Sequence, residues 1–159
     1  MIRIGVISDT HLKKPTDDFR RMMEHHFSGV DHLIHAGDII GPDMYQYLCL
    51  WNLFAVRGNM DDRDLWDVLP KTRIETLGGK RIGMVHGAGS WYAIESFVLT
   101  QFDDVDLIVF GHSHIPVYRK EKTTELFNPG ALKRPLSQQK MVGLIEIEDR
   151  IVCRHIPVP

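Results

Sequence analysis

The chain has 159 residues, of which 43% are hydrophobic and 25% are charged, and its formal net charge is −2. This length suits one domain over residues 1–159, long enough to bury a core without disulfides or a structural metal. The composition excludes disordered, collagen-like and coiled-coil classes, and the weak net charge argues against nucleic-acid or membrane-surface binding.

The first part of the chain alternates strand-like and helical segments. The hydrophobic pattern predicts strands at residues 2–8, 32–36, 53–56, 73–77, 80–85 and 107–110, and helices near 19–27, 42–51 and 90–98. Phe19, Met22, Met23 and Phe27 recur at helical spacing and are expected to face the core. Residues 59–70 are expected to be irregular, and Gly78 and Gly79 have the signature of a hairpin turn. From residue 117 onward hairpins are expected, with strands at 117–122, 124–128, 141–147 and 151–156. We therefore expect one α/β domain whose second part is antiparallel.

The two cysteines indicate whether the protein works in a reducing or an oxidising cellular compartment. Cys49 and Cys153 lie in apolar runs without CxxC spacing, which predicts buried free thiols in a reducing environment. The N-terminus lacks the pattern of a signal peptide, and no window has 18 apolar residues. We expect a cytoplasmic protein with no membrane partner.

Polar side chains follow five of the predicted strands, at the point where each strand ends. They are, in chain order, Asp9 and His11, Asp38, Asn59, His86, and His112 and His114. The dipeptides "GD" and "GN" are common turn signals on their own, whereas "GHSH" at 111–114 is more specific. Because the carboxyl ends of strands form the ligand-binding edge of an α/β sheet, the ordered set predicts one site.

The segments "DTH", "GD", "GNMD", "HG" and "GHSH" in this order resemble the motif series of the calcineurin-like metallophosphoesterases. The short length, "RGN" and the "NPGA" at 128–131 make the chain most similar to the small YfcE-like phosphodiesterase group. A tight turn is expected at "NPGA". The resemblance implies a four-layer α/β/β/α sandwich with two mixed β-sheets, the metallo-dependent phosphatase fold. It also implies a two-metal site at the strand ends.

Counting donors supports two ions. Seven candidate side chains are too many for one ion that must also hold a nucleophile. Imidazole, carboxylate and amide donors without thiolate suit several divalent metals; we expect Mn²⁺, with Ni²⁺, Fe²⁺, Co²⁺ and Zn²⁺ as alternatives. The resemblance implies that Asp38 bridges, that the first ion is held by Asp9, His11 and His114, and that the second is held by Asn59, His86 and His112.

The "GHSH" segment tests this arrangement. In an extended segment His112 and His114 would lie about 7 Å apart with their side chains on one side. We expect His112 to face one ion and His114 the other, with Gly111 keeping the turn small.

The hypothesis is hydrolysis of a small phosphate ester by a hydroxide that bridges the two metals and attacks phosphorus in line with the leaving oxygen. Two divalent ions, two carboxylates and one hydroxide sum to +1, which matches a phosphodiester monoanion. The catalytic candidates are Asp38, Asn59 and Asp61. The substrate-binding candidates are Arg57, Asn59 and His112.

One position departs from the larger phosphatases of this superfamily. They carry His directly after "GN", where it assists the leaving group, and here the residue is Met60. A thioether cannot donate a proton. Asp61 follows as a candidate to orient a water or a ligand, and the proton source for the leaving group stays unassigned.

A different class of function remains as the alternative. The retromer subunit of this fold is a non-catalytic interaction scaffold, and loss of metal ligands would mark that role. All seven positions here keep metal-competent side chains, which favours the enzyme. The other histidines are assigned to surface or core roles: His25, His26, His32, His35 and His155. A homodimer or homotetramer is left open, because the sequence does not specify an interface.

Overall fold

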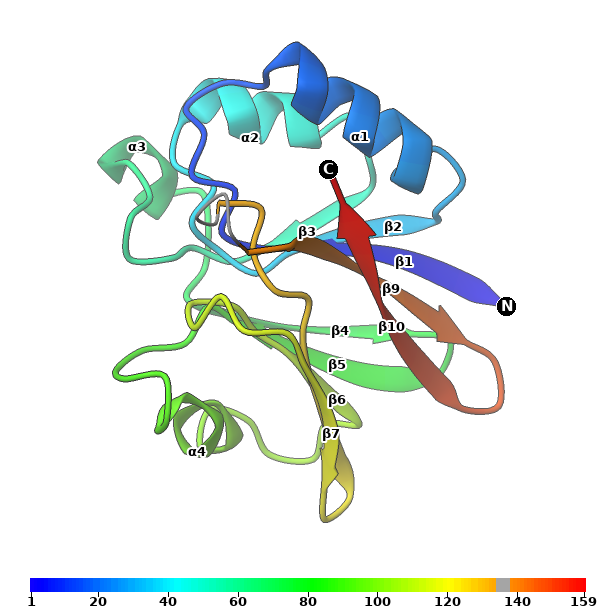
Figure 1. Cartoon of the computed structure of the whole chain (residues 1–159). Coiled ribbons are helices and arrows are strands. Elements are labelled where there is room, and N and C mark those ends of the chain that lie inside the picture. Colours follow the sequence, from blue (N-terminus) through cyan, green and yellow to red (C-terminus); the bar gives the residue numbers. More distant parts are fainter. Residues whose placement is uncertain (134–137) are drawn as a thin grey trace.

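Two five-stranded β-sheets pack face to face, and helices cover the outer side of each (Figure 1). A computed structural model describes residues 1–133 and 138–159. Both sheets contain parallel and antiparallel pairs. The predicted α/β/β/α sandwich with two mixed sheets is therefore confirmed.

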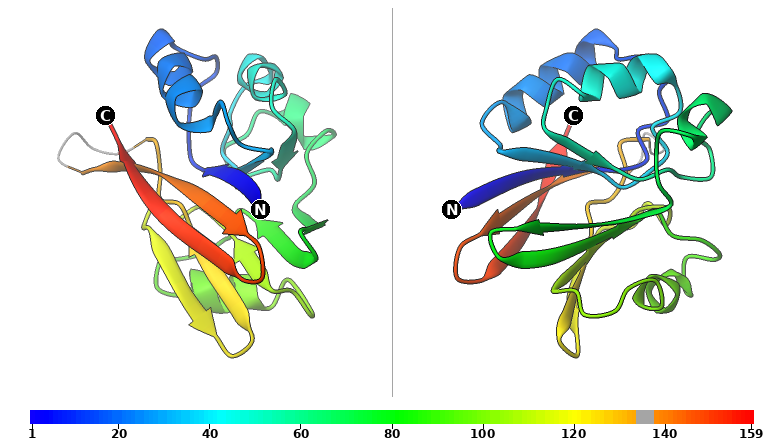
Figure 2. Two further views of the ribbon diagram at one scale, coloured as in Figure 1. Left: turned by 90° about the vertical axis from the view of Figure 1, so that its right-hand side faces the viewer. Right: turned by 180° about the vertical axis from the view of Figure 1, so that it is seen from behind.

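The first sheet has the strand order β10-β9-β1-β2-β3. Its parallel strands are β1 (Ile2–Ile7), β2 (His32–His35) and β3 (Leu53–Ala55), and its antiparallel strands are β9 (Lys140–Ile147) and β10 (Ile151–Val158). The helices α1 (Asp17–Phe27) and α2 (Pro42–Leu48) lie over its outer face, as Figure 2 shows.

Helix α1 begins where the sequence supplies a cap. The Thr16 hydroxyl accepts a hydrogen bond from the Phe19 amide at 3.2 Å, which satisfies one of the free N–H groups of the first turn. Phe19, Met23 and Phe27 are buried against the sheet and Met22 is partly buried. The predicted apolar face of this helix is therefore confirmed.

The second sheet has the strand order β4-β5-β6-β8-β7. Its strands are β4 (Thr72–Leu77), β5 (Lys80–Val85), β6 (Leu107–Val109), β7 (Val117–Glu121) and β8 (Thr124–Asn128), and α4 (Ile94–Leu99) covers the outer face. Gly78 and Gly79 have φ angles of 57° and 75°, which a two-residue turn of type I′ requires. The predicted hairpin is confirmed.

Three apolar cores separate the four layers. The core between the sheets includes Ile4, Ile34, Ile82, Leu107 and Phe127, all almost fully buried. A second core joins the first sheet to α1 and α2, and a third joins the second sheet to α4. The two sheets are thus fixed against each other, and so are the loops that leave their carboxyl ends.

Two expectations are wrong. Cys49 is exposed, because it is the C-cap of α2 and lies beyond the buried face of that short helix, whereas Cys153 is buried as expected. The segment expected to be irregular after Asn59 contains a one-turn helix, α3 (Arg63–Trp66), that buries only Leu65. In the described part of the chain, no helix has the length and apolar character needed to span a membrane.

Candidate metal centre

The loops after β1, β2, β3, β5 and β6 meet at one edge of the sandwich. Two groups of possible ligand atoms form there, Asp9 with His11 and His114, and Asp9 with Asp38 and His86. Within each group the atoms lie within 4.8 Å of one another. Residues far apart in the sequence are therefore close enough to share cations.

The first group surrounds one carboxylate oxygen. Asp9 Oδ1 lies 3.0 Å from His114 Nε2 and 3.7 Å from His11 Nε2. Asp9 Oδ1 and His11 Nε2 are buried, and neither makes a hydrogen bond with the described residues. Buried polar atoms without partners are costly, and a cation between them would remove this cost. These residues fit a metal ion.

The second group lies around His86. Its Nε2 atom is 3.1 Å from Asn59 Oδ1 and 3.4 Å from Asp38 Oδ2. Asn59 Oδ1 is also 3.2 Å from His112 Nδ1. The structure thus places His112 with Asn59 and His86, and His114 with Asp9 and His11.

Asp38 lies between the two groups. Its Oδ2 atom is 3.4 Å from His11 Nε2 and 3.4 Å from His86 Nε2. The other oxygen, Oδ1, accepts a hydrogen bond from the Met60 amide at 2.8 Å. One oxygen is therefore fixed by the backbone, and the other faces both groups.

Five candidate ligands have a strained backbone. Their φ angles are 53° for Asp9, 50° for His11, 61° for Asp38, 65° for His112 and 59° for His114. Such left-handed conformations are uncommon for residues other than glycine and cost on the order of 1–3 kcal/mol each. Strain of this kind persists at functional sites, where the surrounding packing holds it.

The left-handed conformations correct the expectation for "GHSH". The segment is not extended, because it turns sharply and the Ser113 amide donates a hydrogen bond to the Gly111 carbonyl at 2.7 Å. A Cβ atom at Gly111 would collide with the Ser8 hydroxyl. Only glycine allows the two sheets to approach so closely here.

Backbone carbonyls orient two of the histidines. His86 Nδ1 lies 2.7 Å from the Ala36 carbonyl, and His112 Nε2 lies 3.0 Å from the Gly89 carbonyl. Since a carbonyl only accepts, these ring nitrogens carry the proton. The opposite nitrogens, His86 Nε2 and His112 Nδ1, are then free to bind a metal, as is usual for metal-binding histidines.

The charges of the site act on one another. Burial alone would raise the pKa of Asp9, but His11 and His114 outweigh it and hold this pKa well below its ordinary value. Burial alone would lower the pKa of His86, but Asp38 and Asp9 outweigh it and raise this pKa. The carboxylates are thus ionised and attract positive charge, which a divalent cation supplies in place of protons.

A family model described as the calcineurin-like phosphoesterase superfamily domain matches residues 2–150. The chain belongs to this superfamily. A probable metallophosphoesterase of Methanocaldococcus jannaschii is 31% identical over 159 residues, which cover 98% of this chain and 81% of the relative.

Three solved structures share the fold of this superfamily member. An archaeal phosphodiesterase has a TM-score of 0.77 at 21% identity and covers 99% of this chain and 100% of its own. Vps29 of Chaetomium thermophilum has a TM-score of 0.78 at 18% identity and covers 99% of this chain and 98% of its own. The phosphoesterase YfcE of E. coli has a TM-score of 0.69 at 20% identity and covers 91% of this chain and 88% of its own, in agreement with the predicted YfcE-like resemblance.

Asp61 holds two ligand loops of this phosphoesterase domain together. Its carboxylate is buried and accepts hydrogen bonds from the backbone amides of Gly58 at 2.6 Å, Ile40 at 2.7 Å and Asp38 at 3.3 Å. Burial raises the pKa of Asp61, and these N–H groups partly oppose the shift. Because both oxygens are already engaged, this geometry favours a positioning role over the expected contact with water or ligand.

Sequence reasoning missed the role of His35. Its ring is fully buried: Nδ1 accepts a hydrogen bond from the Gly37 amide at 3.1 Å, and Nε2 lies 3.2 Å from the Thr10 hydroxyl. That hydroxyl donates in turn to the Asp38 carbonyl at 3.3 Å. Burial lowers the pKa of His35 to about 3. A neutral His35 therefore connects the loops after β1 and β2.

Asn128 of "NPGA" was expected to form only a turn. Its side chain is buried and donates to the Gly111 carbonyl at 2.9 Å and to the Ser113 hydroxyl at 3.2 Å. It also accepts from the Gly130 amide at 2.9 Å, which makes the expected turn. Asn128 thus supports the loop that carries His112 and His114. In the sequence, the signal for this role was its position at the end of a predicted strand.

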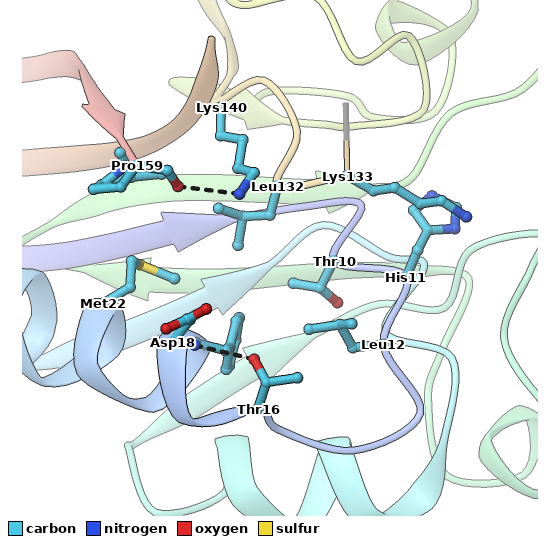
Figure 3. A pocket seen from close by; sticks show the side chains of 12 residues that line it. Thr10, His11, Leu12, Thr16, Asp18, Met22, Leu132, Lys133, Lys140 and Pro159 are labelled. Carbon is cyan, nitrogen blue, oxygen red and sulfur yellow. Dashed lines mark hydrogen bonds between the residues drawn. The ribbon is translucent and has the colours of Figure 1, made fainter. Parts of the chain in front are cut away.

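Two pockets adjoin the centre, one beside each ligand group. We call them the His11 pocket, of about 360 Å³, and the Arg57 pocket, of about 380 Å³. Figure 3 shows the His11 pocket, with His11 at one end and Met22 and Pro159 towards the other. The Arg57 pocket includes Asn59 and His86 in its wall. The Met60 side chain is exposed.

Replacing Asp61 by Asn should destabilise the fold and loosen the centre. The amide nitrogen would face a backbone N–H, with a cost of about 1–3 kcal/mol. Displaced ligand loops should weaken Mn²⁺ binding by about 10- to 100-fold. Urea unfolding and metal titration measure both effects, and exposed Asp64→Asn is the matched control. If Asp61→Asn instead lowered the turnover number at saturating metal without changing metal affinity, the positioning role would be wrong.

Acid should destabilise the metal-free protein partly through His35. Its folded-state pKa of about 3 lies below the ordinary value of 6.5, so in this interval the unfolded chain binds more protons and stability falls as the pH falls. Between about pH 6 and about pH 4.5 the wild type should lose about 2 kcal/mol more than His35→Gln. Urea unfolding tests this, with exposed His25→Gln as control. Equal losses in wild type and His35→Gln would contradict it.

Proposed function

We propose that this phosphoesterase is a two-metal phosphodiesterase that hydrolyses a small phosphate ester. The observation that carries the proposal is the position of Asp38 Oδ2, 3.4 Å from one histidine nitrogen of each ligand group. A carboxylate oxygen in this position can hold two cations about 3.5–4 Å apart, the spacing of two-metal hydrolases.

The ligand sets follow from the two groups. Asp9, His11 and His114 would hold one cation, Asn59, His86 and His112 the other, and Asp38 would bridge them. When bound, the cations would lower the pKa of a water so that it attacks phosphorus in line with the leaving oxygen, and would stabilise charge on the phosphoryl oxygens. Mn²⁺ is the proposed metal, with Ni²⁺, Fe²⁺, Co²⁺ and Zn²⁺ as alternatives.

The remaining roles belong to side chains of the chain itself. Asp38 and Asn59 would fix the geometry of the reacting centre, and Asn59 and His112, at the less buried side, would contact the phosphoryl group. Arg57 would approach the substrate from the Arg57 pocket. Met60 supplies only its backbone N–H, to Asp38. With no acid at that position, hydrolysis should favour esters whose leaving groups depart without protonation.

The net charge favours a diester over a monoester. Two divalent cations, the carboxylates of Asp9 and Asp38 and an attacking hydroxide sum to +1, which complements a phosphodiester monoanion. The similarity to an archaeal phosphodiesterase and to the phosphoesterase YfcE supports this class of reaction.

The scaffold alternative has less support. Vps29 shares the fold, but this chain keeps all seven candidate ligands, and the buried atoms of Asp9 and His11 lack hydrogen bonds in the described part of the chain. A cytoplasmic location and a homodimer or homotetramer stay predictions of the sequence.

Replacing Asp38 by Asn should remove both metal binding and activity. The variant keeps the shape of the side chain but loses the charge that two cations would share. We expect the rate on bis(p-nitrophenyl) phosphate with Mn²⁺ to fall by about 100-fold or more, and bound metal to fall below two ions per chain. Exposed Asp103→Asn is the control. Wild-type rate and metal content in Asp38→Asn would refute the proposed bridge.

A further inference from the structure

The Arg57 pocket lies directly beside the proposed reaction centre. Asn59 and His86 form part of its wall, together with Arg57, Trp66, Lys71 and Phe97. Its volume of about 380 Å³ is at the lower end of the range for ligand pockets, about 300 to 1,000 Å³. It can therefore take one compact substituent of a substrate whose phosphoryl group lies at the metal centre.

Arg57 is held in place in this pocket. Its guanidinium lies 4.8 Å from the centre of the Trp66 ring and donates to the Trp66 carbonyl at 3.2 Å. Trp66 is itself fixed, because its indole N–H donates to the Asp61 carbonyl at 2.9 Å. The guanidinium has five N–H donors. Among the described residues, the Arg57 side chain interacts only with the ring and the carbonyl of Trp66, so most of these donors remain for a ligand. A cation held in this way loses little side-chain entropy on binding an anion.

Lys71 adds a second cation to the same pocket. It is exposed and forms no ion pair with the residues that the structure describes. Several surface arginines have carboxylate partners, for example Arg73 with Glu75 at 2.6 Å and Arg154 with Glu146, whereas no lysine among the described residues forms an ion pair. Among the described residues, no Asp or Glu lines the Arg57 pocket. Its positive charge is therefore uncompensated.

The His11 pocket has a different character. Asp18 accompanies Lys133 and Lys140 in its wall, and Lys140 already donates to the Pro159 carbonyl at 3.1 Å, as Figure 3 shows. Apolar side chains such as Phe19 and Met22 form much of the rest. The two pockets thus differ in charge, so the two substituents of a diester would be distinguished.

We propose that the Arg57 pocket binds a second phosphate group, carried on one substituent of the phosphodiester substrate. This inference rests on the proposed phosphodiesterase function and names its substrate class. Two uncompensated cations match a phosphate monoester, with its charge of about −1.5 to −2 near neutral pH, better than a carboxylate. The planar fork of Arg57 also suits phosphate oxygens.

Two esters with the same scissile bond test the proposal. Thymidine 5′-(p-nitrophenyl phosphate) carries one phosphate, and its 3′-phosphorylated form carries a second. With Mn²⁺, we expect wild-type kcat/KM to be at least about tenfold higher for the doubly phosphorylated ester. Lys71→Gln should reduce this ratio by about tenfold, whereas Lys120→Gln, an exposed lysine on β7, should keep it. Equal kcat/KM for the two esters in the wild type would overturn the inference while leaving the phosphodiesterase proposal intact.

Binding without turnover separates the two proposals further. If neither ester is hydrolysed, the proposed phosphodiesterase function fails. NMR of the metal-free protein with thymidine 3′,5′-bisphosphate then tests separately whether the Arg57 pocket binds phosphate. The indole N–H signal of Trp66 should shift on titration in the wild type, and the shift should be weaker in Lys71→Gln. A Trp66 signal that does not move would overturn the phosphate subsite.

Discussion

The structure depends on the Asp38 carboxylate and the charges that surround it. One oxygen is held by the backbone, and the other lies at the same distance from a histidine of each ligand group. Buried carboxylates and imidazoles so close together are costly unless opposite charge is present. The centre is therefore best understood as a set of ligands prepared for cations, and the loops around it serve to hold this set.

Those loops are strained, and the sandwich holds them. Five candidate ligands have left-handed backbones, a cost that a loose loop would relax. Three packed cores fix both sheets, while Asp61, His35 and Asn128 connect the loops through buried hydrogen bonds. Rigid sheets and buried polar contacts thus maintain a geometry that local sequence preferences alone would not.

Much of the fold follows from the sequence because apolar runs and turn residues are local signals. The strands, the Gly78–Gly79 hairpin and the buried face of α1 were predicted in this way. The convergence of the seven polar residues was also predictable, since they follow strand ends. Helix α3 was missed because one turn shows no periodicity, and Cys49 was misplaced because its apolar neighbours do not reveal that the helix ends there.

Local sequence signals do not reveal the residues that hold the ligand loops in place, such as His35 and Asp61. His35 lies in a buried strand like any core residue, and its link through Thr10 to Asp38 exists only when two loops meet. Asp61 looks like a candidate acid in "GNMD", but its three backbone donors come from two different loops. The turn at His112 and His114 depends in the same way on the close approach of Gly111 to Ser8.

The most direct test of the account is crystallography of the protein with Mn²⁺ and anomalous scattering at the manganese edge. Two peaks per chain are expected, about 3.5–4 Å apart, with Asp38 between them, His114 beside one and His112 beside the other. A single peak, or two peaks that do not share Asp38, would contradict the two-metal centre.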